Sequence, residues 1–118
     1  VQCITVPANT KIIAAGFQVT SSATQNTGTD ATAALGTGAD DNEYVTAFDI
    51  DGAADGAYAP SVTVSADLVI GSADTLDLTL AGGGASFTAG EIRVFAVLMD
   101  VSSLGEMEAA EVSRDALA

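Results

Sequence analysis

The sequence lacks histidine altogether and contains almost no basic residues. Lys11, Arg93 and Arg114 are its only cationic side chains among 118 residues, against sixteen Asp and Glu, and the formal net charge is −13. Histidine is the usual general base near neutral pH and the commonest metal ligand, while lysine and arginine bind phosphates and nucleic-acid backbones. We therefore expect no nucleic-acid partner and no membrane partner, because anionic surfaces of both kinds repel the chain.

Groups that support catalysis are equally scarce. Serine and threonine are plentiful, but without histidine none of them has the base partner of a hydrolase triad. Two carboxylates can cleave a glycoside. That chemistry also needs a sugar-binding cleft, and the aromatic side chains that usually line one are limited to four Phe and two Tyr, with no Trp. We predict no catalytic residue, no cofactor and no enzymatic activity.

A single cysteine, Cys3, excludes an intrachain disulfide. With no second cysteine and no histidine, a metal or redox role is not expected, and a small buried hydrophobe is the default interpretation. The segment 1–10 lacks the basic start and apolar run of a signal peptide. The longest apolar run, 94–99, has the length of a strand and falls far short of the ~20 residues of a membrane span.

The dominant hydrophobic period is two, which is typical of strands with one buried and one polar face. Leu76, Leu78 and Leu80, for example, alternate with polar residues. The pattern predicts strands at 2–6, 11–21, 30–36, 43–50, 61–70, 74–81 and 91–101. No helix-length pattern separates them, so we predict an all-β fold, an antiparallel β-sandwich of jelly-roll type with about seven to eight strands.

Glycine-containing turns separate these runs. Gly71-Ser72 is a hairpin signal of the Gly-X type between the strands at 61–70 and 74–81. The triplet 82–84 is all glycine and predicts a flexible hairpin connection before the last strand.

The length fits one domain, which we place at residues 1–101. Residues 102–118 change character and become rich in Glu, Ala and Met. Residues 106–117 could form a short helix, but twelve residues are marginal for a helix that stands alone. We interpret this C-terminal segment, 102–118, as a tail or short helix that docks on a neighbour, with Leu104 and Met107 as anchors.

Asp49, Asp51 and Asp55 form a spaced run of carboxylates in a glycine-containing loop, an arrangement that suits the six to eight oxygen ligands of Ca²⁺. Ala53 and Pro60, however, occupy positions where an EF-hand loop carries ligands. A second acidic patch lies at 40–43. The favoured interpretation of both is an acidic, solvated turn, with the three aspartates kept as a calcium hypothesis.

Small side chains dominate the expected core, which predicts a marginally stable monomer that gains burial between subunits. The run 94–99 is apolar on both faces, and it can bury both only if something covers the second one. We therefore predict a homo-oligomer, with a trimer favoured, and name Arg93, Phe95, Leu104 and Met107 as interface candidates. For Arg93, a solvated strand end is an equally good interpretation.

Several short motifs follow one another in an order that resembles small β-proteins of tailed bacteriophages. These motifs are Val6-Pro7-Ala8-Asn9-Thr10-Lys11-Ile12, then Ala15-Gly16-Phe17-Gln18-Val19-Thr20, Leu35-Gly36-Thr37-Gly38-Ala39-Asp40, Tyr58-Ala59 after an acidic glycine turn, and Thr88-Ala89-Gly90-Glu91-Ile92-Arg93-Val94. The resemblance covers roughly residues 4–100 and leaves the C-terminal segment unexplained. Each motif marks a turn or a strand and none marks a chemistry.

The resemblance implies a virion component with a jelly-roll-like, often trimeric fold. The function that it favours is a capsid decoration (cement) protein on the outer capsid surface, with the major capsid protein as its partner. The resemblance assigns no functional residue to this chain. The alternative is a receptor- or glycan-binding module of a head or tail fibre, and a third possibility is a module of a cellular surface layer or pilus. Strong acidity would suit a saline setting.

Overall fold

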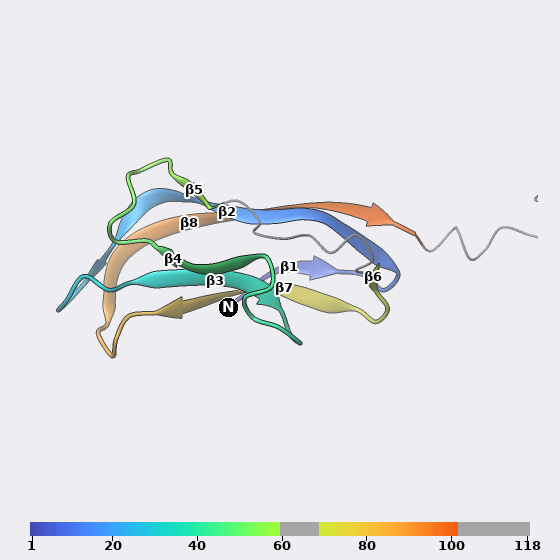
Figure 1. The fold of residues 1–118 in the computed structure, drawn as a ribbon, viewed down its shortest axis with the longest axis horizontal. Helices are drawn as coiled ribbons and strands as arrows, with labels where there is room; N and C mark the ends of the chain where they lie inside the picture. Colours follow the sequence, from blue (N-terminus) through green and yellow to red (C-terminus); the bar gives the residue numbers. More distant parts are fainter. Residues whose placement is uncertain (60–68, 102–118) are drawn as a thin grey trace, which may run out of the picture.

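The computed structural model describes residues 1–59 and 69–101, which form two antiparallel sheets packed face to face (Figure 1). The strands are β1 (Gln2–Val6), β2 (Thr10–Gln25), β3 (Thr32–Thr37), β4 (Val45–Asp49), β5 (Tyr58–Ala59), β6 (Val69–Ile70), β7 (Asp74–Ala81) and β8 (Phe87–Asp100). The predicted all-β antiparallel sandwich is confirmed, while its jelly-roll connectivity stays a prediction. The described residues include no helix that is long and apolar enough to cross a membrane.

One sheet has the strand order β1-β7-β3-β4, and the other is built around β2. Phe17 of β2 pairs with Ala59 of β5 on one side and with Val94 of β8 on the other. Lys11 likewise lies between β6 and β8, so β5 and β6 share one edge of β2 while β8 takes the opposite edge. In Figure 1, β2 and β8 run side by side along the length of this sheet.

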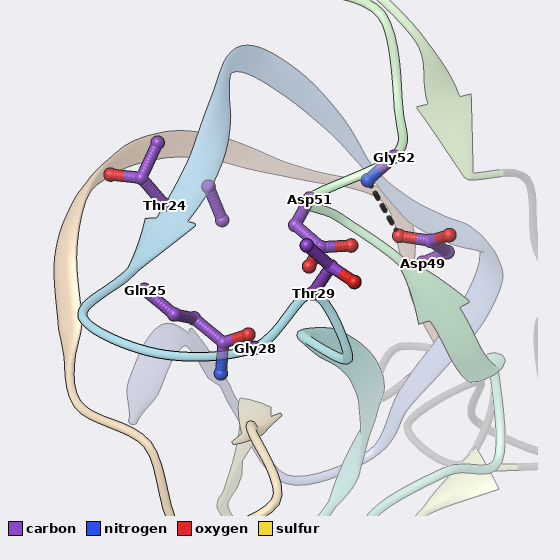
Figure 2. A pocket seen from close by; sticks show the side chains of 8 residues that line it. Thr24, Gln25, Gly28, Thr29, Asp49, Asp51 and Gly52 are labelled. Atoms are coloured by element: carbon purple, nitrogen blue, oxygen red, sulfur yellow. Dashed lines mark hydrogen bonds between the residues drawn. The ribbon is translucent and has the colours of Figure 1, made fainter.

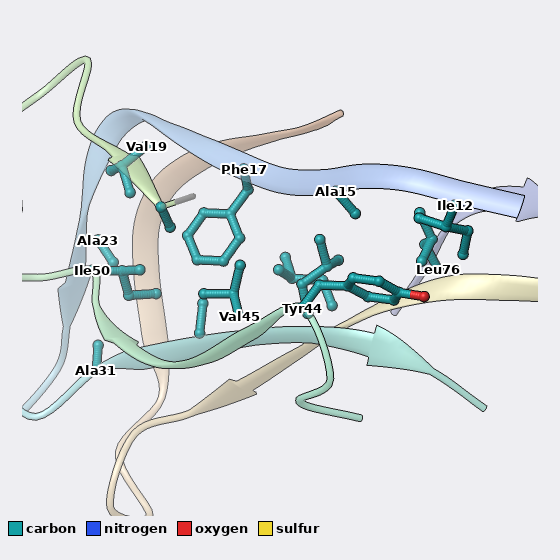
Figure 3. Packing of buried hydrophobic residues seen from close by; sticks show 14 of the residues in the cluster. Ile12, Ala15, Phe17, Val19, Ala23, Ala31, Tyr44, Val45, Ile50 and Leu76 are labelled. Atoms are coloured by element: carbon teal, nitrogen blue, oxygen red, sulfur yellow. The ribbon is translucent and has the colours of Figure 1, made fainter. Parts of the chain in front are cut away.

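The core fills the space between the two sheets with side chains from both (Figure 3). Its largest fully buried members are Tyr44, Phe17, Ile12, Leu35, Ile50, Leu76, Val6 and Val19. The rings of Phe17 and Phe48 meet edge to face, with centroids 5.7 Å apart and planes at 88°. Several alanines complete the core, so its stability comes from many small contacts and few aromatic ones.

The strands predicted at 2–6 and 74–81 are confirmed. The strands predicted at 11–21 and 91–101 belong to longer elements, because Thr24 pairs with Ala89 and Gln25 with Phe87 beyond the apolar runs. This extension is polar on β2 and carries no period-two signal. The two-residue strand β5 was not predicted. Of the strand expected at 61–70, residues 61–68 lie outside the described part of the chain, and the last two residues form β6.

Two predicted hairpins are wrong, since both connections cross from one sheet to the other. Gly71-Ser72 joins β6, which pairs with β2, to β7, which pairs with β1 and β3. The glycine triplet 82–84 joins β7 to β8 across the end of the sandwich, in a turn closed by the Ala85 N–H donating to the Gly82 carbonyl at 2.8 Å. Gly83 and Gly84 have φ of 56° and 91°, values that favour glycine.

Cys3 is exposed, which corrects the expectation of a small buried hydrophobe. On the edge strand β1, Cys3 lies at a register shift between Gln2 and Ile4, where the regular alternation of the strand is interrupted. The thiol lies 3.4 Å from the Val1 carbonyl oxygen. The segment 102–118, with Leu104 and Met107, lies outside the described residues, so its docking role stays a prediction.

Candidate binding surfaces

The outer face of the β2–β8 sheet, the side turned away from the core, carries a row of exposed apolar side chains. On β8, Ile92, Val94, Ala96 and Leu98 pack against the core. Strand geometry therefore turns the alternate residues outward. Phe95, Val97 and Met99 are 39%, 55% and 45% exposed. We call these three residues, with Ile13 of β2, Tyr58 of β5 and Val69 of β6, the outer apolar face.

A register shift in β2 brings Ile13 onto this face. Ile12 pairs with Leu98 and is fully buried, while Ala14 pairs with Val97. Ile13 is thus an extra residue between two ladder pairs, and its side chain is 42% exposed. An extra residue of this kind is a β-bulge, which changes which side chains a strand presents on each side.

Cross-strand pairing fixes the two ends of the outer apolar face. At one end, Val69, Lys11 and Met99 lie in one row across three strands. At the other end, Tyr58, Gln18 and Arg93 form a second row. The rings of Tyr58 and Phe95 contact each other with centroids 6.2 Å apart and planes at 66°. Aromatic and apolar groups therefore lie between the two cationic side chains among the described residues, Lys11 and Arg93.

Charge is distributed very unevenly between this face and the rest of the described residues. Arg93 is exposed on β8 two positions from Glu91, which is also exposed, and Asp100 ends the strand. The other described carboxylates lie in loops or on the other sheet: Asp30, Asp40, Asp41, Glu43, Asp49, Asp51, Asp55, Asp74 and Asp77. The outer apolar face is thus close to neutral on a chain of net charge −13.

Of the predicted interface residues, Phe95 belongs to the outer apolar face and Arg93 lies in the cross-strand row at one end of it. Ile13, Tyr58 and Val69 were not predicted. Residues 12 and 13 are adjacent isoleucines that break the period of two, and this break is the only signal that could have indicated the bulge. Tyr58 and Val69 reach the face through short strands that pair with β2 at positions distant in sequence.

Asp49 and Asp51 line a polar cleft of about 540 Å³, together with Thr24, Gln25 and Thr29 (Figure 2). The Gly52 N–H donates to Asp49 Oδ1 at 2.7 Å, and this hydrogen bond is the main cause that lowers the Asp49 pKa. The pKa of Asp51 is raised, first by desolvation and then by the hydrogen bond between its carboxyl group and that of Asp49. As the pH falls, Asp51 is therefore the member of the pair that takes up a proton first.

The third aspartate of the calcium hypothesis does not join this pair. Asp55 Oδ1 accepts a hydrogen bond from the Ser22 N–H at 2.7 Å, and Asp55 is not among the residues that line the cleft. Within residues 1–59 and 69–101, no three His, Cys, Asp or Glu side chains are grouped so that they could hold a metal ion. The predicted ligand set is not assembled, and its carboxylates accept hydrogen bonds from backbone amides.

The second acidic patch is a turn of the same kind. Asp40 Oδ1 accepts the Asn42 N–H at 3.2 Å, and the Asp40 carbonyl accepts the Thr37 N–H at 2.7 Å. The pKa of Glu43 is raised by partial burial and by the nearby charge of Asp40. These contacts close the loop between β3 and β4.

No family model, curated protein or solved structure matches this chain.

Proposed function

We propose that this protein is a non-enzymatic structural component of a virion, a decoration protein that binds the outer surface of a tailed-phage capsid. The observation that carries the proposal is the outer apolar face, where Phe95, Val97 and Met99 stay exposed beside Ile13 and Tyr58. Contiguous apolar patches of this kind mark interaction sites on soluble proteins. The motif order that resembles phage β-proteins supports the same role.

In this role the sandwich works as a rigid surface, and each copy bridges neighbouring capsomers of the major capsid protein. One copy needs only a weak contact, because many simultaneous contacts on one particle add through multivalency. The bridges oppose the outward pressure of packaged DNA. Jelly-roll connectivity and a homo-oligomer belong to the same proposal, and the resemblance by itself favours a trimer.

The test is binding of the purified chain to empty, expanded heads of the phage that encodes it. We expect saturable co-sedimentation with the heads and a higher temperature of head rupture when the sites are filled. A matched sample of unexpanded heads shows whether binding depends on the mature lattice. Absence of co-sedimentation with expanded heads, under salt conditions in which the phage is stable, would overturn the proposal.

The polar cleft favours a second candidate, a receptor- or glycan-binding module of a head or tail fibre. Its lining offers hydroxyl, amide and carboxylate groups from Thr24, Gln25, Thr29, Asp49 and Asp51, which suit the hydrogen bonds of a sugar. None of the residues lining it is aromatic. Binding to host cells that is lost in Gln25→Ala and absent toward heads would favour this candidate over the decoration role.

A further inference from the structure

The edge of β8 that faces away from β2 is the second unusual feature beside the outer apolar face. Among the described residues, β8 pairs only with β2, although it is fourteen residues long. A strand at the edge of a sheet presents a row of unpaired N–H and C=O groups that another strand can use. Sheet proteins usually protect such edges with proline, lysine, bulges or very short strands.

The segment 94–99 has none of these protections. It contains no proline and no charged residue, and the register shifts near it insert the extra residue in β2, not in β8. The charged residues Arg93 and Glu91 protect only the part of the β8 edge that precedes residue 94. A six-residue apolar stretch of high β-propensity on an open edge is a template for strand pairing.

The charge distribution favours a second copy of this chain as the partner that pairs with the β8 edge. The loops and the other sheet hold nearly all the described carboxylates, so two copies repel each other through most of their surfaces. Near the segment 94–99 the charges of Lys11 and Arg93 offset those of Glu91 and Asp100. A second copy can therefore approach without repulsion along β8, whereas a basic partner is drawn to the acidic surfaces.

We propose that two copies of this chain associate through antiparallel pairing of their β8 strands, over residues 94–99, in a two-fold dimer. The pairing is isologous, because the same edge is used by both copies. It satisfies the backbone groups of both edges, and it joins two outer apolar faces into one surface of double width. It goes beyond the proposed function, and it predicts a dimer where the resemblance favours a trimer.

The side-chain pattern restricts the register of this pairing. Residues opposite each other in an antiparallel pair lie on the same face of a sheet. The outward side chains of the two copies lie on the same side of the joined sheet only in registers where one residue of β8 pairs with the same residue of the other copy. In those registers the two-fold axis lies at a residue position and not midway between two positions. Ala96 and Val97 lie at the middle of the segment, and an axis at Ala96 places Phe95 of one copy opposite Val97 of the other.

The first experiment measures association of the full chain by analytical ultracentrifugation at micromolar concentrations. We expect a monomer–dimer equilibrium that Val97→Lys weakens by at least about tenfold, because the dimer would bring two like charges close together beside its axis. The matched control is Thr79→Lys, which adds the same charge on the exposed side of β7 in the other sheet. Equal weakening by both substitutions, a stable trimer, or a monomer at every concentration would overturn the proposal.

The second experiment, hydrogen exchange on the wild-type chain, separates edge pairing from stacking of the two faces. In a β8 paired only with β2, alternate amides of 94–99 point to the free edge and exchange quickly. The β8–β8 dimer protects all six amides, and dilution to the monomer releases the alternate ones. A dimer with only alternate amides protected overturns the proposal in favour of face-to-face stacking. A monomer with all six protected overturns it by assigning the edge to another segment of the same chain.

Discussion

The ring of Phe95 lies directly over Gly16 on the neighbouring strand. The two residues are cross-strand partners of β8 and β2, and a Cβ placed on Gly16 would lie 2.9 Å from Cζ of Phe95 and 2.6 Å from the Ala59 carbonyl oxygen. An aromatic ring over a cross-strand glycine replaces the side chain that the glycine lacks. This contact holds Phe95 in the middle of the outer apolar face, next to Tyr58.

We expect Gly16→Ala to destabilise the protein by roughly 1–3 kcal/mol, because the new methyl group must displace both the ring and a backbone carbonyl. Chemical denaturation followed by circular dichroism measures the change in free energy of unfolding. The matched control is Gly71→Ala, since no described atom other than those of Gly71 and its chain neighbours lies within 4 Å of a Cβ at that position. Equal effects of the two substitutions would contradict the contact described here.

A substitution at Tyr44 is expected to stabilise the protein, in contrast to the change at Gly16. Its side chain is fully buried, and its hydroxyl has no hydrogen-bond partner within the described part of the chain. In Figure 3 the hydroxyl points toward the end of the core where Ile12 and Leu76 pack. Burial is the main cause that raises the pKa of Tyr44 to about 12. We expect Tyr44→Phe to stabilise the fold by about 1 kcal/mol, since it removes an unsatisfied polar group from an apolar site.

The measurement for Tyr44→Phe is again the free energy of unfolding from denaturant titration. Tyr58→Phe is the control, because Tyr58 is 63% exposed and its hydroxyl is free to bond with water. A loss of stability in Tyr44→Phe, with none in Tyr58→Phe, would show that the Tyr44 hydroxyl has a partner after all.

The Asp49–Asp51 pair predicts a pH effect whose sign follows from the two pKa shifts. The pKa of Asp51 is raised in the folded chain, so the stability linked to its proton is present at low pH and is lost as the pH rises through that pKa. The lowered pKa of Asp49 acts in the opposite sense, and its contribution is lost as the pH falls. At neutral pH, Asp51 is therefore the carboxylate that costs stability.

We expect Asp51→Asn to raise the thermal midpoint at neutral pH, because the amide can still hydrogen-bond to Asp49 without a second negative charge. The gain should fade as the pH falls through the raised pKa of Asp51, because Asp51 itself is then protonated. Asp41→Asn, which removes a charge from an exposed turn, is the control for general charge reduction. A midpoint that rises equally in both variants at every pH would contradict the coupling of the pair.

Calcium should act on this protein only as a screening ion. Two carboxylates converge in the cleft and Asp55 bonds elsewhere, which leaves too few oxygens for the usual coordination of Ca²⁺. We expect equal shifts of the thermal midpoint in CaCl₂ and MgCl₂ at the same ionic strength. A larger shift in Ca²⁺, lost in Asp51→Ala and in Asp55→Ala, would restore the calcium hypothesis.

Salt should strengthen self-association. Each chain carries a net charge of −13, and repulsion between two copies falls as the screening length shortens from about 10 Å at ~0.1 M salt to about 3 Å at ~1 M. We expect the dissociation constant measured by ultracentrifugation to decrease steadily over this range. An increase with salt would indicate that attraction between opposite charges, and not pairing of apolar strands, holds the copies together.

The sequence by itself determined the strand character of the chain and its acidic, non-basic surface. Alternation in β7 predicted its bounds correctly and identified the buried residues Leu76 and Leu78, because a period of two reports a local property, the two sides of an extended backbone. Composition likewise sufficed for the net charge. The unbroken apolar run 94–99 predicted a strand with a second apolar face, and Phe95, Val97 and Met99 are exposed on it.

The tertiary structure decided which strands pair, and therefore which residues are exposed together. The bulge at Ile13, the place of Tyr58 beside Phe95 and the exposure of Cys3 on an edge strand all depend on partners far away in sequence. The crossings at Gly71-Ser72 and at the glycine triplet were missed for the same reason. A turn residue reports that the chain reverses, but the sheet it then joins is determined by long-range burial.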